Sequence, residues 1–339
     1  MSIRSALPLV ASLIFFSLSP ATSGGIEEIK IASTGPAVST LPLEIATRKG
    51  FFRDEGLEAL TLTMRTNITV NALLSRNVDY ATPSTSVIKA ATGGLPVKMI
   101  AVLQGRPDYF LITRKEIRSN KDLKGKRVAI GSFGAPADLA LRAVVTEEGL
   151  DFDRDIVRLQ MVGNSARYTS LISGAVDATV LSPPFNLQAE KAGYKDLLWL
   201  GERFELPLAG LGVRDETFQK NPKQILAMIR AVFRAVAFAK THPEETMRML
   251  INWVRVDPEV AAMSYELGKR SWSERGMVAD AAVKMVVDQS MLEQSLKTPF
   301  RSTKYATGLL LNKLGGNCKK SDLDDSFIGE RFFSVRLSQ

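Results

Sequence analysis

The 339-residue sequence is poor in reactive side chains, with one histidine, His242, and one cysteine, Cys318. A single cysteine cannot form an internal disulfide, so the stability of the fold has to come from core packing. Any Ser-His or Cys-His pair would depend on His242, which stands in a polar stretch at a predicted helix start. No HExxH or CxxC motif is present, and adjacent acids such as Asp54 and Glu55 do not share a helix face. The composition therefore disfavours an enzyme, a metal site or a bound cofactor.

Blocks of one charge sign are also missing. The chain has 44 Lys and Arg against 36 Asp and Glu, a formal charge of +8, but the basic residues are spread among acids. A nucleic-acid-binding protein would concentrate them on a patch or a helix. The balance predicts a solvated basic surface that attracts anions weakly.

Long apolar runs are scarce, and the only prominent one lies at the N-terminus. Residues 6–18 are mostly apolar, follow the single basic residue Arg4, and precede small residues up to Ser23. This pattern predicts a secretory signal peptide over residues 1–23, because the run is too short for a good membrane span. No cysteine stands directly after the run, so we expect no lipid anchor and a protein free in the periplasm.

The first stretch with a clear structural pattern is 29–62. Residues 29–32 alternate like a strand, 33–40 form a polar loop, Pro42 suits a first helical turn, Gly50 ends that helix, and 57–62 form the next strand. This is a parallel βαβ unit with hydroxyl groups at the carboxyl edge of its first strand. Ligands bind at that edge in open α/β sheets, and a helix N-terminus there favours anionic groups.

A second set of α/β units follows in the middle of the chain. Strand 127–130, loop 131–136 and the helix after it repeat the opening order, and residues 73–81 resemble residues 171–179. The chain is also longer than one core usually holds. The sequence thus predicts an α/β protein of two Rossmann-like lobes joined by two crossings, near 105–108 and 207–210, with 209–213 as part of the second crossing. The predicted domains are 24–107 (lobe I, first part), 108–208 (lobe II) and 209–339 (lobe I, second part, with C-terminal helices).

Three motifs carry a resemblance to a known family. They are KGFFRDEGL at 49–57, DLKGKRVAI at 122–130 and LISGAVDATVLSPP at 171–184. In this order the chain resembles the extracytoplasmic solute-binding proteins of ABC importers of the nitrate/sulfonate/taurine type, from Gly25 to about Leu314. The resemblance implies a type 2 periplasmic binding protein fold that closes over a small molecule. It also implies delivery to an ABC permease and its ATPase, and we expect a monomer that binds no nucleic acid.

The resemblance assigns most of the candidate ligand-binding residues by position. They are Ser39, Thr40, Asn67, Ser84 and Thr85 in lobe I, and Tyr109, Gly134, Ala135, Asn164, Pro183 and Phe185 in lobe II. Two more candidates come from the residues themselves: Phe133, an aromatic beside a loop, and Arg167, a cation at a predicted helix start.

Helix N-termini together with Phe133, Phe185 and Tyr109 favour a small organic anion, a carboxylate or a sulfonate, as the ligand. Two alternatives are a thiamin-precursor-like pyrimidine or another heterocycle, and a periplasmic sensor input that binds without transport. An enzyme of the same fold is disfavoured, because the chain lacks the Cys-rich motif of the related pyrimidine-forming enzymes.

Overall fold

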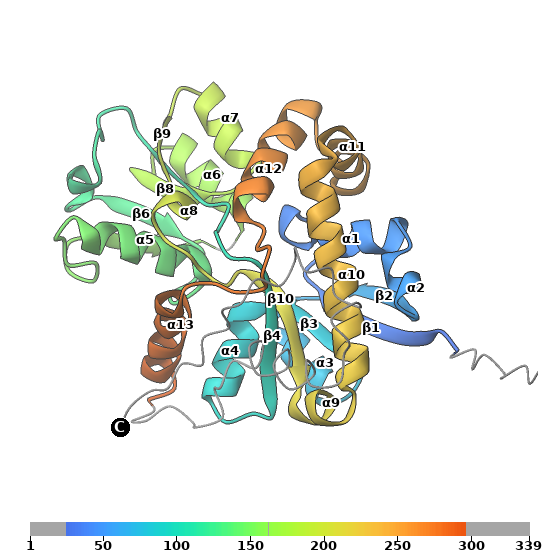
Figure 1. The fold of residues 1–339 in the computed structure, drawn as a ribbon. Helices are drawn as coiled ribbons and strands as arrows, with labels where there is room; N and C mark the ends of the chain where they lie inside the picture. Colours follow the sequence, from blue (N-terminus) through green and yellow to red (C-terminus); the bar gives the residue numbers. More distant parts are fainter. Residues whose placement is uncertain (1–24, 162, 296–339) are drawn as a thin grey trace, which may run out of the picture.

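The computed structural model describes residues 25–161 and 163–295, which form two lobes, each built on one five-stranded sheet (Figure 1). The predicted two-lobed α/β architecture is confirmed. The predicted signal peptide, Cys318 and the part of the last domain beyond residue 295 lie outside the described residues. Among the described residues, no helix has the length and apolar character needed to cross a bilayer.

Lobe I has the strand order β2-β1-β3-β10-β4, in which β10 runs antiparallel to both of its neighbours. Its strands are β1 (Glu27–Ser33), β2 (Leu57–Thr63), β3 (Tyr80–Pro83), β4 (Val97–Gln104) and β10 (Ala209–Arg214). Its helices are η1 (Val38–Thr40), α1 (Leu41–Arg48), α2 (Phe51–Asp54), α3 (Thr66–Leu74), α4 (Ser84–Thr92), α9 (Asp215–Lys220), α10 (Pro222–Thr241), α11 (Pro243–Val254), α12 (Pro258–Ser271) and α13 (Asp280–Glu293).

Lobe II repeats this order as β7-β6-β8-β5-β9, with β5 antiparallel to β8 and β9. Its strands are β5 (Phe110–Thr113), β6 (Arg127–Ile130), β7 (Val157–Gln160), β8 (Ala178–Leu181) and β9 (Lys195–Trp199). Its helices are η2 (Asn120–Leu123), α5 (Pro136–Glu147), α6 (Asn164–Ile172), α7 (Phe185–Lys191) and α8 (Leu200–Arg203).

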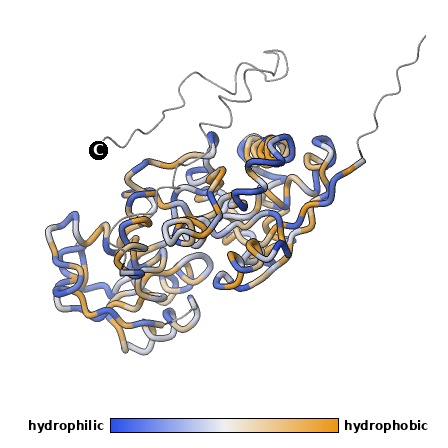
Figure 2. The backbone as a smooth tube through the Cα atoms, turned by 90° about the horizontal axis from the view of Figure 1, so that it is seen from below, coloured by the Kyte–Doolittle hydropathy of each residue, from blue (hydrophilic) through white to orange (hydrophobic). Residues whose placement is uncertain are grey.

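The core of lobe I follows from the hydrophobic periodicity of its elements. Ile29 and Ile31 alternate along β1, and both are fully buried. On α10, Ile225, Met228 and Val232 are spaced at i, i+3 and i+7, and they pack into the same cluster. The tube view shows hydrophobic and hydrophilic residues alternating at short intervals along the chain in both lobes (Figure 2).

The repeat detected between residues 73–81 and 171–179 has one structural meaning in both lobes. Asp79 exchanges hydrogen bonds with Lys30 on the neighbouring strand: its carboxylate accepts from the Lys30 N–H at 2.9 Å, and its own N–H donates to the Lys30 carbonyl. Asp177 does the same with Arg127, whose N–H lies 3.0 Å from the carboxylate. Each aspartate therefore joins one parallel strand, β1 or β6, to the turn before its neighbouring strand, β3 or β8.

The two crossings between the lobes are residues 105–109 and residues 204–208. They run side by side, because the Leu206 N–H donates to the Gly105 carbonyl at 2.8 Å and the Leu208 N–H donates to the Gln104 carbonyl at 3.0 Å. The expectation that 209–213 form part of a crossing is wrong, since these residues are strand β10 of lobe I. The glycines concealed the strand: a Cβ on Gly212 would lie 2.6 Å from the Val87 side chain, so close packing requires them.

The last two helices reach across the boundary between the lobes (Figure 1). Leu267 of α12 packs in one apolar cluster with Phe110 and Trp199 of lobe II. Val286 of α13 shares a second cluster with Val87 of lobe I and Leu139 of lobe II. Because the strands of each sheet fall within the predicted ranges, we propose the domain boundaries at 107/108 and 208/209.

Candidate ligand-binding site

The two sheets present their carboxyl edges to the same crossing. Phe110, the first residue of β5, pairs with Leu181 at the carboxyl end of β8. In lobe I, Ala209 pairs with Pro83 and with Gln104 at the carboxyl ends of β3 and β4. Residues 105–109 therefore connect the two edges where ligands of α/β sheets bind. We call the groups at these two edges the interlobe site.

The central side chain of lobe II at this site is Arg167 on α6, which is only 6% exposed. Its Nε donates to the Val180 carbonyl at 2.8 Å, and one terminal nitrogen donates to Asn164 Oδ1 at 2.8 Å. The Asn164 oxygen also accepts from the Ser182 N–H at 3.2 Å. Arg167 and Asn164 thus join α6, whose start the sequence predicts at this point, to the end of β8.

The charge of Arg167 has no counter-ion among the described residues, where no carboxylate lies within ion-pair distance of its guanidinium. Burial lowers the pKa of Arg167, and the nearby Tyr109 hydroxyl acts in the opposite direction. A buried cation without a partner carries a large desolvation cost. An anion bound beside it would offset that cost.

The hydroxyl group of Tyr109 is influenced by one acidic and one cationic side chain, Asp108 and Arg167. Burial raises the pKa of its hydroxyl, the charge of Asp108 raises it further, and Arg167 lowers it. The hydroxyl is therefore within electrostatic range of both groups, and it remains protonated at neutral pH. It is available as a hydrogen-bond donor to a ligand.

The hydroxyl groups predicted in lobe I have different surroundings. Thr40 donates to the Gly35 carbonyl at 2.9 Å and so stabilises its own loop, next to the partly exposed Ser39. Ser84 and Thr85 begin α4 and are buried, and Ser84 Oγ has no hydrogen-bond partner in the described part of the chain. Asn67 is exposed on the first turn of α3. Of the predicted lobe I hydroxyl groups, that of Ser84 is therefore the one that is buried and lacks a hydrogen-bond partner among the described residues.

The loop after β8 supplies the aromatic groups of the site. Pro183 and Pro184 are joined by a cis peptide bond, and Phe185 follows at the start of α7. The Phe185 ring lies 5.9 Å from that of Tyr168 on α6. Asn186, the next residue, is fully buried, and its Oδ1 has no partner among the described residues. This side of the site offers ring faces and a polar amide.

The expectation that the loop after β6 offers free N–H groups to an anion needs correction. The Gly134 N–H donates to Asp138 Oδ2 at 2.8 Å, and the Ala135 N–H donates to the Ser132 carbonyl at 3.1 Å. The carboxylate of Asp138 thus takes the place expected for a ligand. Phe133, in the same loop, is 55% exposed and lies under the guanidinium of Arg158.

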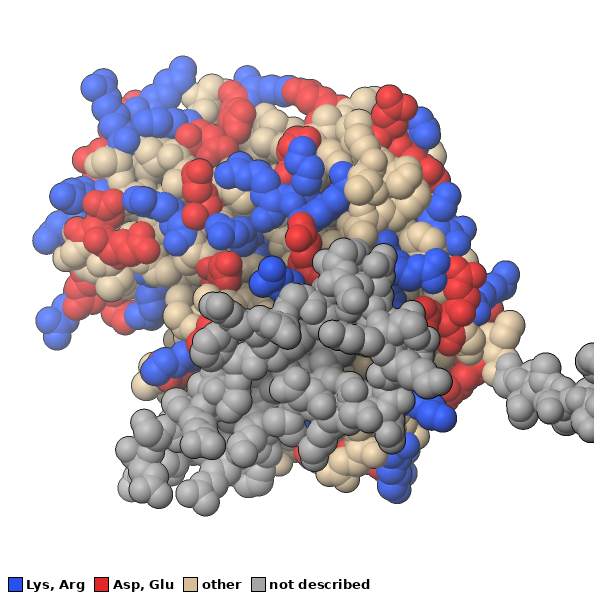
Figure 3. All heavy atoms as spheres, viewed as in Figure 1, with Lys and Arg blue, Asp and Glu red and all other residues tan. Residues whose placement is uncertain are grey.

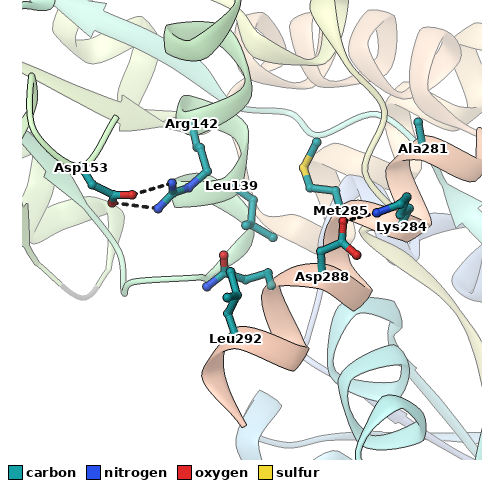
Figure 4. A pocket seen from close by; sticks show the side chains of 9 residues that line it. Leu139, Arg142, Asp153, Ala281, Lys284, Met285, Asp288 and Leu292 are labelled. Carbon is teal, nitrogen blue, oxygen red and sulfur yellow. Dashed lines mark hydrogen bonds and ion pairs between the residues drawn. The ribbon is translucent and has the colours of Figure 1, made fainter. Parts of the chain in front are cut away.

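A separate groove of about 470 Å³ lies between α5 and α13 (Figure 4). Its lining residues are Leu139, Arg142, Asp153, Ala281, Lys284, Met285, Asp288, Gln289 and Leu292. Its charged groups pair with each other: Arg142 bonds Asp153 at 2.8 Å, and Lys284 bonds Asp288. We assign no ligand to this groove. The wider surface on this side mixes both charge signs (Figure 3).

Sequence reasoning missed four residues whose surroundings point to function. Gln104 ends β4 just before the first crossing, Asp108 belongs to that crossing, and Asn186 is the second residue of α7. Lys89 of α4 reaches Gly134 of lobe II. Gln104 Oε1, like Ser84 Oγ and Asn186 Oδ1, is buried without a partner among the described residues. Their roles depend on long-range contacts, for which the sequence carries no local signal.

The sheet order and the position of the site define a two-lobed solute-binding fold of the periplasmic binding protein type. A family model described as NMT1/THI5 like matches residues 38–246, more than half of the chain, and the chain belongs to this family. Within the described residues, no group of three or more His, Cys, Asp or Glu side chains is arranged to hold a metal ion.

Two relatives illustrate the sequence similarity. The binding protein YtlA of Bacillus subtilis is 24% identical over 73% of this chain and 77% of YtlA. The riboflavin-binding protein RibY of Chloroflexus aurantiacus is 24% identical over 65% of this chain and 64% of RibY.

Two solved structures share the fold. The aliphatic sulphonate binding protein SsuA from Escherichia coli superposes with a TM-score of 0.69 at 16% identity, covering 80% of this chain and 94% of SsuA. The desulfurization enzyme DSZB superposes with a TM-score of 0.59 at 15% identity, covering 85% of this chain and 99% of DSZB. The fold is therefore shared by a binding protein and an enzyme, and function has to be argued from the site.

Proposed function

We propose that the protein is an extracytoplasmic solute-binding protein that captures a small organic anion, a carboxylate or a sulfonate, at the interlobe site. Delivery to an ABC permease with its ATPase follows from this proposal. The observation that carries it is the uncompensated charge of Arg167, 6% exposed beside the protonated hydroxyl of Tyr109. The structurally similar protein SsuA is an aliphatic sulphonate binding protein, and this similarity supports the same class of ligand for the present chain.

We also propose that the protein binds its ligand without chemical turnover. The single histidine, His242, is exposed at the end of α10, stacked on Phe238 at 4.1 Å and hydrogen-bonded to Thr241. It is not among the groups of the interlobe site, so among the described residues no histidine stands beside Arg167 or Tyr109 to act as a general base. The site therefore lacks the Ser-His or Cys-His pair of many hydrolytic enzymes.

A thermal-shift screen in low-salt buffer tests the ligand class. Alkanesulfonates, carboxylates, pyrimidines and riboflavin are compared, because a ligand that binds only the folded state raises the melting temperature. Anionic hits are expected. Hits confined to pyrimidines or riboflavin would replace this proposal with the heterocycle alternative.

The residue test uses Arg167→Met, with Arg154→Met as the matched control, since Arg154 is 88% exposed on the same lobe. Anion binding should fall at least tenfold in the first variant and stay unchanged in the second. Arg167→Lys keeps the charge and should bind at intermediate strength, which separates loss of charge from loss of folding. Mass spectrometry of the recovered ligand should find it unchanged; accumulation of a product would refute binding without turnover.

A further inference from the structure

Helices α12 and α13 are joined by residues 272–279, which we call the linker. The linker lies along the start of the first crossing. The Ser273 N–H donates to the Leu103 carbonyl at 2.8 Å, and the Gly105 N–H donates to the carbonyl of Ser271, the last residue of α12, at 3.0 Å. Since the second crossing bonds to the Gly105 carbonyl, the linker is a third segment of the hinge, beside the two crossings (Figure 1).

One side chain of the second crossing, Glu205, contacts both of the other segments. One of its carboxylate oxygens accepts a hydrogen bond from the Ala279 N–H at 2.6 Å. Its other oxygen lies 3.6 Å from the guanidinium of Arg106 in the first crossing. Ala279 is the residue before α13, so the negative charge of Glu205 also lies at the positive end of that helix. Hydrogen bonds to an ionised group are stronger than those between neutral groups.

The groups that Glu205 joins are fixed to different lobes. Arg106 donates to the carbonyl of Gly201 on α8 of lobe II at 3.0 Å. Helix α13 is attached to α4 of lobe I, because the side chains of Ser290 and Gln294 both donate to the Lys89 carbonyl, at 3.4 and 3.2 Å. Glu205 therefore connects a helix attached to lobe I with a residue bonded to lobe II.

We propose that Glu205 is a positioning residue of the hinge, which holds α13 to both crossings and so restrains the angle between the lobes. A rotation of lobe II relative to α13 has to move the second crossing away from Ala279, and this breaks the hydrogen bond. The inference goes beyond the proposed function, because it concerns the ligand-free protein and holds for any ligand of the interlobe site.

Distances between spin labels on the two lobes test the inference. The labels are attached to cysteines introduced by Arg154→Cys in lobe II and Lys220→Cys in lobe I, whose wild-type side chains are both exposed, in a chain that also carries Cys318→Ser. With Glu205 intact, the ligand-free protein should give a narrow distance distribution. Glu205→Ala should broaden this distribution and add distances outside its original range.

Hydrogen exchange of the Ala279 amide, followed by NMR, reports on the bond itself. The exchange rate should rise about tenfold or more in Glu205→Ala, because the amide loses its charged acceptor. Glu205→Gln keeps an acceptor oxygen without the charge, so both measurements should give values between those of Glu205→Ala and the wild-type residue. It also serves as the second variant if Glu205→Ala does not fold.

Glu266→Ala is the matched control, because Glu266 is exposed on α12 and pairs with Lys269 of the same helix. It should leave both the distances and the Ala279 exchange rate unchanged. An unchanged distance distribution in a folded Glu205 variant would overturn the inference, even with faster Ala279 exchange, because Glu205 would then only cap α13. Neither measurement uses a ligand, so a failure of the proposed function would be seen separately, in the thermal-shift screen.

Discussion

Lys89 of lobe I donates a hydrogen bond to the carbonyl oxygen of Gly134 of lobe II at 3.1 Å, while its ammonium group pairs with Glu293 at 2.8 Å. Glu293 is at the end of α13, so three elements meet at this point. A Cβ on Gly134 would collide with the Glu293 carboxylate, and the left-handed backbone of Gly134 (φ +67°) also requires glycine. Lys89 thus links the lobes at the side of the interlobe site.

We expect this link to favour the arrangement in which the lobes approach each other. Lys89→Met removes both contacts, and with the two crossings as hinges the lobes should separate more often. Small-angle scattering of the ligand-free variant should give a larger radius of gyration than the wild-type protein. Lys284→Met is the control, since Lys284 is 73% exposed and pairs within its own helix. Superimposable profiles for wild type and Lys89→Met would show that the link has no such role.

Ligand binding should bring the two lobes closer together, which is the opposite of the effect expected for Lys89→Met. A ligand that contacts both lobes stabilises the closed arrangement, because only that arrangement makes both sets of contacts. The wild-type radius of gyration should therefore decrease on addition of a saturating anion identified in the thermal-shift screen. No change on binding would contradict closure about residues 105–109 and 204–208.

Asp177 should contribute to stability through its bonds to Arg127. Asp177→Ala leaves the Arg127 N–H without its acceptor, and the free energy of unfolding should fall by about 1–3 kcal/mol. Asp54→Ala, which removes an exposed pair with Arg234, should change it by less than about 0.5 kcal/mol. Urea titration measures both, and equal effects would show that the strand contact contributes nothing specific.

The effect of Asp177 should also depend on pH. The hydrogen bond from Arg127 holds the pKa of Asp177 below its usual range. Its stabilisation is therefore present above the unfolded pKa of about 4 and is lost as the pH falls further. The difference between wild type and Asp177→Ala should shrink toward pH 3.

Asp196 should have the opposite effect on the pH dependence of stability, which it lowers as the pH rises. Burial on β9 beside Glu190 raises the pKa of Asp196 to about 7. Between about pH 4 and pH 7 the unfolded chain has released this proton while the folded protein still holds it, so stability falls as the pH rises through this window. Relative to the wild-type protein, Asp196→Asn should become more stable from pH 5 to pH 8, by at most about 3 kcal/mol, because about two pH units of this window lie above pH 5. Glu116→Gln, an exposed control, should follow the wild-type curve. Parallel curves for Asp196→Asn would mean that the carboxyl group titrates normally.

The parts of the fold that local patterns determine could be predicted from the sequence. The opening βαβ unit and the matching positions of Asp79 and Asp177 follow from hydrophobic period and turn residues. Strand β10 was not predicted, because Gly210 and Gly212 lack the side chains that mark a strand. Its glycines are needed for packing against β4 and α4, a contact between distant parts of the chain.

In the candidate site too, the features set by local sequence patterns could be predicted and those set by long-range contacts could not. The position of Arg167 at a helix start after a strand is visible in the sequence, but its lack of a counter-ion among the described residues is visible only in the structure. Gly134 was predicted as an anion-binding position, whereas Asp138, four residues later, accepts its N–H. Asp108 has no sequence signal, because its position depends on the antiparallel pairing of β5 with β8.

A crystal structure of the wild-type protein with the tightest anion of the thermal-shift screen would test the central claim most directly. We expect the ligand between the two sheets, with its acid oxygens within hydrogen-bond distance of Arg167 and its body against Tyr109 and Phe185. A ligand bound elsewhere, for example in the groove between α5 and α13, or one without contact to Arg167, would contradict the account.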